Sequence, residues 1–224
     1  FIAYTGMYVG IPFSSVLITQ WNKSIFGLSV TFLASIPMTA ELLATMLCSL
    51  LLLPVYRRMN LKLVFAVSTL ISAAANFLCF FASSPEQLII LRFCSGIGFA
   101  GIKYSLNTIV SLGSLTPENT TDNLAALNAG LLGGITCGGT LGAVIASSIN
   151  VHTSYLIAGV FIFAFAVAVL ALSPWKLFRE NSAESEKESS GSRFGALSLV
   201  VKPSFIRYAL LVAIPMNVGL MFVV

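Results

Sequence analysis

The chain has 224 residues, of which 57% are hydrophobic and only 9% are charged, whereas an ordinary soluble domain carries about 25% charged residues. Polar side chains are therefore too few to cover a water-soluble fold, and the apolar surface is too large for a disordered chain. A membrane-spanning helix takes about 20 apolar residues, so the length allows roughly seven spans. The composition predicts an all-α, polytopic membrane helical bundle surrounded by the lipid bilayer.

Composition also excludes several kinds of chemistry. The chain has one histidine, His152, and four cysteines without a Cys-x-x-Cys pair, so we expect no metal site and no cofactor. One histidine and one buried acid also leave little catalytic equipment, so we expect no enzyme. The net charge is +4, but the basic residues flank apolar runs, which indicates membrane topology and not nucleic-acid binding.

Seven apolar segments follow one another along the chain, most of them separated by short polar breaks. None shows the alternation of a membrane β-barrel strand, and each is long enough for a helix. The segment 175–204 is rich in serine and glutamate, and it predicts a charged cytoplasmic linker between a six-helix bundle over 1–174 and a seventh helix over 205–224. The predicted spans are 1–20, 27–53, 61–82, 86–113, 123–149, 154–173 and 205–224.

Lysine and arginine predict the orientation of these spans. Nine of the 12 basic residues fall beside the loops after the second, fourth and sixth spans or at the start of the seventh, and only Lys23 falls on the opposite side. The N-terminus is then cytoplasmic, in a multi-pass protein of a plasma or bacterial inner membrane. Because the chain begins and ends inside apolar runs, we expect it to be part of a longer protein.

The first two spans contain three candidate functional residues. Tyr4 and Tyr8 lie one turn apart, and they either line a cavity opposite the fourth span or simply pack in the membrane. Glu41 is the only acid deep in a predicted span. A carboxylate there has to be protonated or paired, so Glu41 either forms a salt bridge with Arg92 or Lys103 or carries a coupling proton.

Two basic residues lie inside the fourth span. Arg92 and Lys103 are about three turns apart and within roughly 20° on one helix face, which Asn107 continues one turn later. A basic side chain at mid-helix costs about 2.5–3.5 kcal/mol, so such a residue usually faces a cavity or a partner. Arg92 is near the outer end and has the alternative of reaching the lipid headgroups. Lys103 is deeper, and we expect it to face a cavity.

Small residues recur every four positions in the fifth span. Glycine lets helix backbones approach closely, and in lipid this packing drives helix association. The pattern predicts close packing, and so many glycines also favour bending of the helix during a conformational cycle. The ridge consists of Ala126, Gly130, Gly134, Gly138, Gly142 and Ala146.

Two motifs of the fourth and fifth spans are Arg92-x-x-x-Gly96-x-Gly98 and Gly134-x-x-x-Gly138-Gly139-x-x-Gly142-Ala143. They resemble the fourth-helix and fifth-helix motifs of the major facilitator superfamily of transporters. In that family the arginine of the fourth-helix motif is associated with proton-coupled members. The fifth-helix motif of antiporters has a proline and a final glycine where this chain has Gly139 and Ala143.

The loop after the second span resembles the family's basic loop between helices 2 and 3. Arg58 and Lys62 keep its positive charge, but Arg57 stands in the place of the family's aspartate. Asn60 replaces a glycine, and asparagine also adopts left-handed backbone angles. In the family this aspartate takes part in a gating contact with the second half of the protein, and this chain lacks that acid.

The resemblance implies two six-helix bundles with the substrate site between them, so this chain would need a C-terminal half of the same protein. It implies a secondary active transporter of a small solute, by symport or antiport, through alternating access. Arg92 and Lys103 favour an anionic solute, and Glu41 favours proton coupling. The alternative is a transporter-like sensor or receptor that binds a ligand without moving it, which the altered loop favours. A seven-span receptor of the G-protein-coupled type would place the N-terminus outside.

Overall fold

The computed structural model describes most of the first three quarters of the chain. The predicted linker over 175–204 and the predicted seventh helix over 205–224 lie outside the described residues, as do Arg57 and Arg58. The described residues are 1–22, 29–52, 55–56, 59–113 and 117–172.

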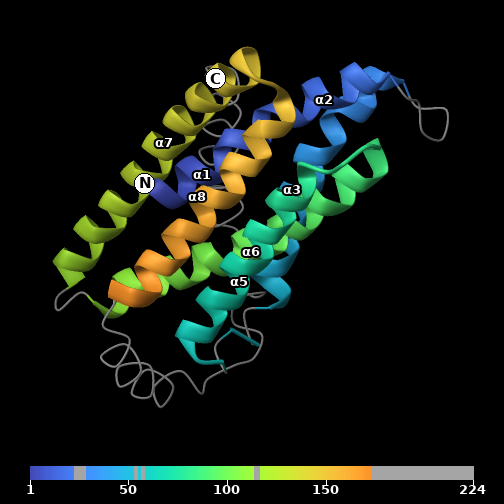
Figure 1. Cartoon of the computed structure of the whole chain (residues 1–224). Coiled ribbons are helices and arrows are strands. Elements are labelled where there is room, and N and C mark those ends of the chain that lie inside the picture. Colours follow the sequence, from blue (N-terminus) through green and yellow to red (C-terminus); the bar gives the residue numbers. More distant parts are fainter. Residues whose placement is uncertain (23–28, 53–54, 57–58, 114–116, 173–224) are drawn as a thin grey trace, which may run out of the picture. The chain divides into compact units, whose positions relative to one another are not determined.

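Helices make up the secondary structure of these residues (Figure 1). They are the α-helices α1 (Ile2–Gly10), α2 (Ser14–Trp21), α3 (Val30–Leu51), α5 (Leu61–Cys79), α6 (Pro85–Leu112), α7 (Pro117–Ser148) and α8 (Val151–Leu172), and the short 3-10 helix η1 (Ile11–Phe13).

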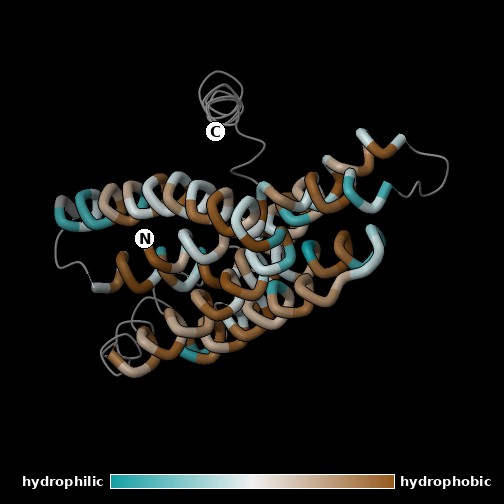
Figure 2. Tube along the Cα trace, turned by 45° about the horizontal axis from the view of Figure 1, so that its top comes forward, coloured by the Kyte–Doolittle hydropathy of each residue, from teal (hydrophilic) through white to brown (hydrophobic). Residues whose placement is uncertain are grey.

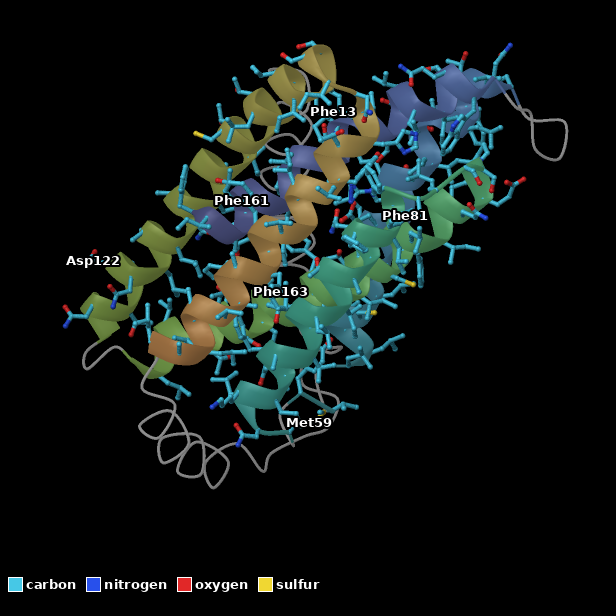
Figure 3. The ribbon with its side chains drawn as sticks, viewed as in Figure 1. Phe13, Met59, Phe81, Asp122, Phe161 and Phe163 are labelled. Carbon is cyan, nitrogen blue, oxygen red and sulfur yellow. The ribbon has the colours of Figure 1, made fainter. Side chains whose placement is uncertain are left out.

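Six helical stretches of the described part are long and apolar enough to cross a membrane, which confirms the prediction of a transmembrane helical bundle. The first is formed by α1, η1 and α2 together, and α3, α5, α6, α7 and α8 provide one each. In Figure 3, Met59 lies at the bottom and Phe81 at the right, beside opposite ends of α5, and Asp122 lies at the left, near the start of α7.

Polar side chains fix where several of these helices begin. Ser29 Oγ accepts a hydrogen bond from the Phe32 backbone N–H at 3.3 Å, and Ser84 Oγ accepts one from Gln87 at 3.4 Å. Asn150 Oδ1 accepts from the Thr153 backbone N–H at 2.8 Å, so α8 begins three residues before the predicted position. Helix α7 begins six residues early, because its polar first turns precede the apolar run that hydropathy detects.

The packing of the helices repeats between the two halves of the described chain. Helix α3, the second span, packs against α6, the fourth, and α7, the fifth span, packs in the same way against α1, the first. The third span contacts both the fourth and the sixth, and the sixth contacts the first. Exchanging the first three spans for the last three therefore preserves these contacts, as in folds built from two inverted three-helix repeats.

Glycines provide the close approach in both of these contacts. A Cβ on Gly96 of α6 would meet the Glu41 carbonyl oxygen of α3 and would lie 2.9 Å from Ala44 Cβ. A Cβ on Gly134 of α7 would lie 2.6 Å from Tyr4 Cβ, and one on Gly138 would lie 2.6 Å from the Thr5 carbonyl oxygen. The remaining two glycines of the ridge face the same helix region, Gly130 beside Phe1 and Gly142 beside Val9.

Many large apolar side chains of the described part are exposed, as a helical bundle in lipid requires. Phe163 on α8 and Phe81 after α5 are 56% and 62% exposed (Figure 3). Figure 2 shows hydrophobic residues along the length of the helices and not only on their inward faces. Lipid tails are as apolar as these side chains, so their exposure has little cost in a membrane.

Candidate functional site

A cluster of polar side chains is buried between α3, α5 and α6. Glu41 comes from α3, Asn76 from α5, and Arg92 and Ser95 from α6, and none of the four is more than 5% exposed. Buried groups of this kind need hydrogen-bond partners, because an unpaired polar group in an apolar interior is costly. The four side chains provide one another with these partners.

Their hydrogen bonds form a closed ring, which we call the Glu41 ring. Arg92 Nη1 donates to Glu41 Oε2 and to Asn76 Oδ1, both at 3.3 Å. Ser95 Oγ donates to Glu41 Oε1 at 3.1 Å, and Asn76 Nδ2 donates to Ser95 Oγ at 3.2 Å. Each member therefore contacts two others. The ring joins three helices and contains one ion pair, between Arg92 and Glu41.

Local helix geometry explains how the ring is assembled. Arg92 and Ser95 are three residues apart, so they share one face of α6 and reach the two carboxylate oxygens of Glu41 together. Gly96, the next residue, leaves the space in which the α3 backbone comes close to α6 at Glu41. Asn76 Nδ2 also donates to the Ser72 carbonyl oxygen one turn earlier, at 2.9 Å, which holds its amide in place.

A second group of side chains holds the other side of Arg92. Arg92 Cζ lies 5.0 Å from the centroid of the Tyr155 ring of α8, a cation–π geometry. Tyr155 Oη donates to Ser14 Oγ of α2 at 3.0 Å. A Cβ on Gly10 of α1 would lie 3.2 Å from Arg92 Nη2 and 2.7 Å from Tyr155 Cδ1, so a larger residue there would displace the Tyr155 ring. Arg92 thus connects α1, α2 and α8 to the Glu41 ring.

The guanidinium of Arg92 is not fully satisfied by these contacts. Its side chain is fully buried, yet Nε and Nη2 have no hydrogen-bond partner among the described residues. Charge neutralisation of Arg92 therefore depends on Glu41, the partner in its ion pair. Protonation of the carboxylate would leave a buried cation without a counter-ion, so binding of a single proton would strongly destabilise this arrangement.

The two partners predicted for Glu41 are now distinguished. Arg92 contacts Glu41, whereas Lys103 is exposed and forms no ion pair within the described part of the chain. Arg92 is buried by protein, so it does not reach the headgroups. The contacts that bury Arg92 come from three other helices, and neither hydropathy nor charge counting detects them.

Lys103 and Asn107 lie on a different part of the same helix. Helical spacing places Lys103 between Gly96, which contacts α3, and Phe99, whose ring lies 6.1 Å from that of Tyr4 on α1. The exposed side chain of Lys103 therefore belongs to the face of α6 between α3 and α1, and the half-buried Asn107 follows it one turn later.

Tyr4 and Tyr8 both contact the glycine ridge of α7, but they differ in exposure. Tyr4 is 2% exposed and packs edge-on against Phe99. Tyr8 is half-buried, and a Cβ on Gly138 would lie 3.0 Å from the Cβ of Tyr8. Of the two tyrosines, only Tyr8 leaves part of its surface accessible.

The loop before α5 contributes Asn60 and Lys62. Asn60 caps α5, because its Oδ1 accepts a hydrogen bond from the Lys62 backbone N–H at 3.0 Å. The Lys62 side chain is exposed. Asn60 has φ −61°, so at this position it does not use the left-handed angles that motivated its comparison with glycine.

Sequence reasoning missed Asn76, Ser95, Tyr155 and Ser14. Asn76 is an amide inside an apolar run, and this was the available signal, while Ser95 stands one turn after Arg92 on the same face. Tyr155 and Ser14 are 141 residues apart, and nothing in either apolar segment identifies the other as its partner.

A surface pocket of about 440 Å³ lies elsewhere, between α1, α7 and α8. It is mostly apolar and includes Thr5, Thr136 and Phe161, but none of the candidate residues of the sequence. Among the described residues no group of histidine, cysteine and acidic side chains is arranged to hold a metal ion.

Comparison with known proteins gives one match. The family model described as Major Facilitator Superfamily matches residues 1–224. No curated protein and no solved structure matches the chain. The match covers the whole chain, and it agrees with the six membrane-spanning helices and their repeated packing. The chain therefore belongs to the major facilitator superfamily.

Proposed function

We propose that the protein is a secondary active transporter that moves a small solute by alternating access and couples this movement to protons through Glu41. A transporter-type function follows from the family. The finer proposal is supported by one observation, the buried ion pair between Arg92 and Glu41, with 3.3 Å between Nη1 and Oε2. We also propose that the N-terminus is cytoplasmic, and that a second bundle of the same protein completes the solute pathway.

The ion pair offers a physical means of coupling. With Glu41 ionised, the pair holds α3 and α6 together and neutralises Arg92 in the interior. Protonation of Glu41 removes the counter-ion, and a conformation in which Arg92 gains water or another partner then becomes favourable. A proton that binds the two conformations with different affinity shifts the balance between them, and the conformation reciprocally changes proton affinity.

Glu41→Gln is expected to abolish uptake driven by a proton gradient, because the glutamine side chain neither binds nor releases a proton near neutral pH. Exchange of labelled for unlabelled solute across the membrane should persist, because it needs no net proton movement. Both are measured in proteoliposomes with a panel of small carboxylates. Glu86→Gln, a change of an exposed acid in the first turn of α6, is the matched control and should retain both activities.

Gradient-driven uptake at the wild-type rate in Glu41→Gln would contradict the coupling role. If the wild-type protein bound a carboxylate but supported neither uptake nor exchange, the sensor or receptor function would replace transport.

Lys103 supports the proposal that the solute carries a negative charge. It is an exposed cation on the face of α6 between α3 and α1, and it has no acidic partner within the described residues. A free cation inside a membrane span usually faces a cavity or a charged ligand. A carboxylate on the solute would provide the missing counter-charge, and Asn107 would lie one turn away.

Lys103→Gln is expected to reduce uptake of the transported carboxylate by about tenfold or more, the scale of one lost charge-assisted hydrogen bond. The change should appear mainly in KM, and Lys103→Arg should retain most of the activity. Glu86→Gln, which removes an exposed charge in the first turn of the same helix, is the control. An equal loss for the carboxylate and for its neutral amide would exclude a charge contact.

A further inference from the structure

Asn76 is the member of the Glu41 ring that does not contact the Glu41 carboxylate itself. It lies on α5, whereas the ion pair is formed by α3 and α6, and its side chain is 1% exposed. A buried asparagine needs hydrogen-bond partners for its amide. Asn76 finds two of them in Arg92 and Ser95, the two residues that donate to the Glu41 carboxylate.

The two contacts of Asn76 orient the donors of Glu41. Its Oδ1 accepts from Arg92 Nη1, the nitrogen that also donates to Glu41 Oε2. Its Nδ2 donates to Ser95 Oγ, which leaves the Ser95 hydroxyl hydrogen free to donate to Glu41 Oε1. Because a hydroxyl can rotate, an acceptor lone pair already in use determines where its hydrogen points. Asn76 therefore directs two donors at the carboxylate without touching it.

Other titratable groups around Glu41 do not orient the donors of its carboxylate. Those that interact with it electrostatically are Arg92 on α6, Tyr8 on α1, Tyr155 on α8 and Cys79 on α5. Arg92 alone among them is charged at neutral pH. The stability of the carboxylate thus depends on Arg92 and Ser95, and Asn76 is hydrogen-bonded to both.

We propose that Asn76 is a positioning residue for the coupling proton, which sets the pH at which Glu41 takes up its proton by orienting Arg92 and Ser95. This inference rests on the proposed function of Glu41. It also gives α5, a helix outside the ion pair, a direct influence on when the pair breaks. A shift of α5 relative to α6 would separate Asn76 from both donors at once.

The test follows the protonation of Glu41 directly and needs no solute. Infrared difference spectra of the protein in liposomes are recorded against pH, and the band of the protonated Glu41 carboxyl is identified by its loss in Glu41→Gln. In Asn76→Ala, the midpoint of this band is expected to move upward by about one pH unit, because the carboxylate loses oriented donors. Ser72→Ala is the matched control, since Ser72 lies one turn away on α5 and its buried Oγ has no partner among the described residues.

Asn76→Asp guards against a folding defect in the alanine variant, because aspartate has nearly the same size. An ionised aspartate cannot donate to Ser95 and adds a negative charge beside Glu41, so its upward shift should be larger. Midpoints equal to the wild type in both Asn76 variants would overturn the role of Asn76 and leave the proton role of Glu41 intact. A wild-type Glu41 band that does not titrate would overturn both the inference and the coupling role.

Discussion

Glu41→Ala is expected to lower the free energy of unfolding by about 3–5 kcal/mol, the scale measured when one partner of a buried ion pair is removed. The reason is the environment of Arg92, whose side chain is fully buried and whose Nε and Nη2 already lack partners within the described residues. Without Glu41, its charge would have no counter-ion. The free energy is measured by titrating the purified protein with a denaturing detergent.

The double variant Glu41→Ala with Arg92→Met distinguishes the stranded charge from lost packing. Replacing both partners of a buried pair by apolar groups is often close to neutral, so most of the lost stability should return. Glu86→Ala on the exposed first turn of α6 should change little. If the double variant were as unstable as Glu41→Ala, the loss would come from packing and not from an unpaired Arg92.

Gly138→Ala in α7 is expected to lower the free energy of unfolding by about 1–3 kcal/mol, the usual range for overpacking a close contact. The added Cβ would lie 2.6 Å from the Thr5 carbonyl oxygen and 3.0 Å from Tyr8 Cβ. The first of these is backbone of α1, which cannot move aside as a flexible side chain can. The two helices would have to separate, and the same detergent titration measures the effect.

Gly139→Ala is the matched control for this change. It inserts the same methyl group one residue later, where nothing lies within 4 Å. Alanine also favours a helix over glycine, so this variant should be neutral or slightly more stable. Equal effects of the two substitutions would contradict a role of the glycine ridge in seating α7 on α1.

Sequence alone predicted the spans well because span length and hydropathy are local properties. The first six predicted spans correspond to the helices of the described chain, and the largest departure is the start of α7. Helix α7 begins with polar turns that precede its apolar run, and α8 begins early because Asn150 caps it. Hydropathy detects the lipid-facing length of a helix, not the capping side chains that begin it.

The candidate site was predictable only in part, for a geometric reason. A helical repeat shows which residues share a face, so it placed Arg92 and Lys103 on one face of α6. It does not show which helix that face meets, nor that Arg92 is buried while Lys103 is exposed. The partner of Glu41 was decided by Gly96, which brings α3 against α6. Asn76 was missed because its role depends on a third helix, α5, whose position no local pattern encodes.

The separation of Glu41 and Arg92 in the sequence has a consequence for the biogenesis of the protein. The two residues are 51 positions apart, so Glu41 is synthesised well before its counter-ion. At about 5–20 residues per second, synthesis of the intervening chain takes about 3–10 s.

During this time α3 exposes an acid that has no ionic partner, and such a residue opposes insertion by about 2.5–3.5 kcal/mol. Asn76 of α5 is made before Arg92, so it is the first member of the Glu41 ring to reach the membrane after Glu41. The ring closes only when α6 has been inserted, and until then the nascent chain depends on a neutral Glu41 or on the insertion machinery.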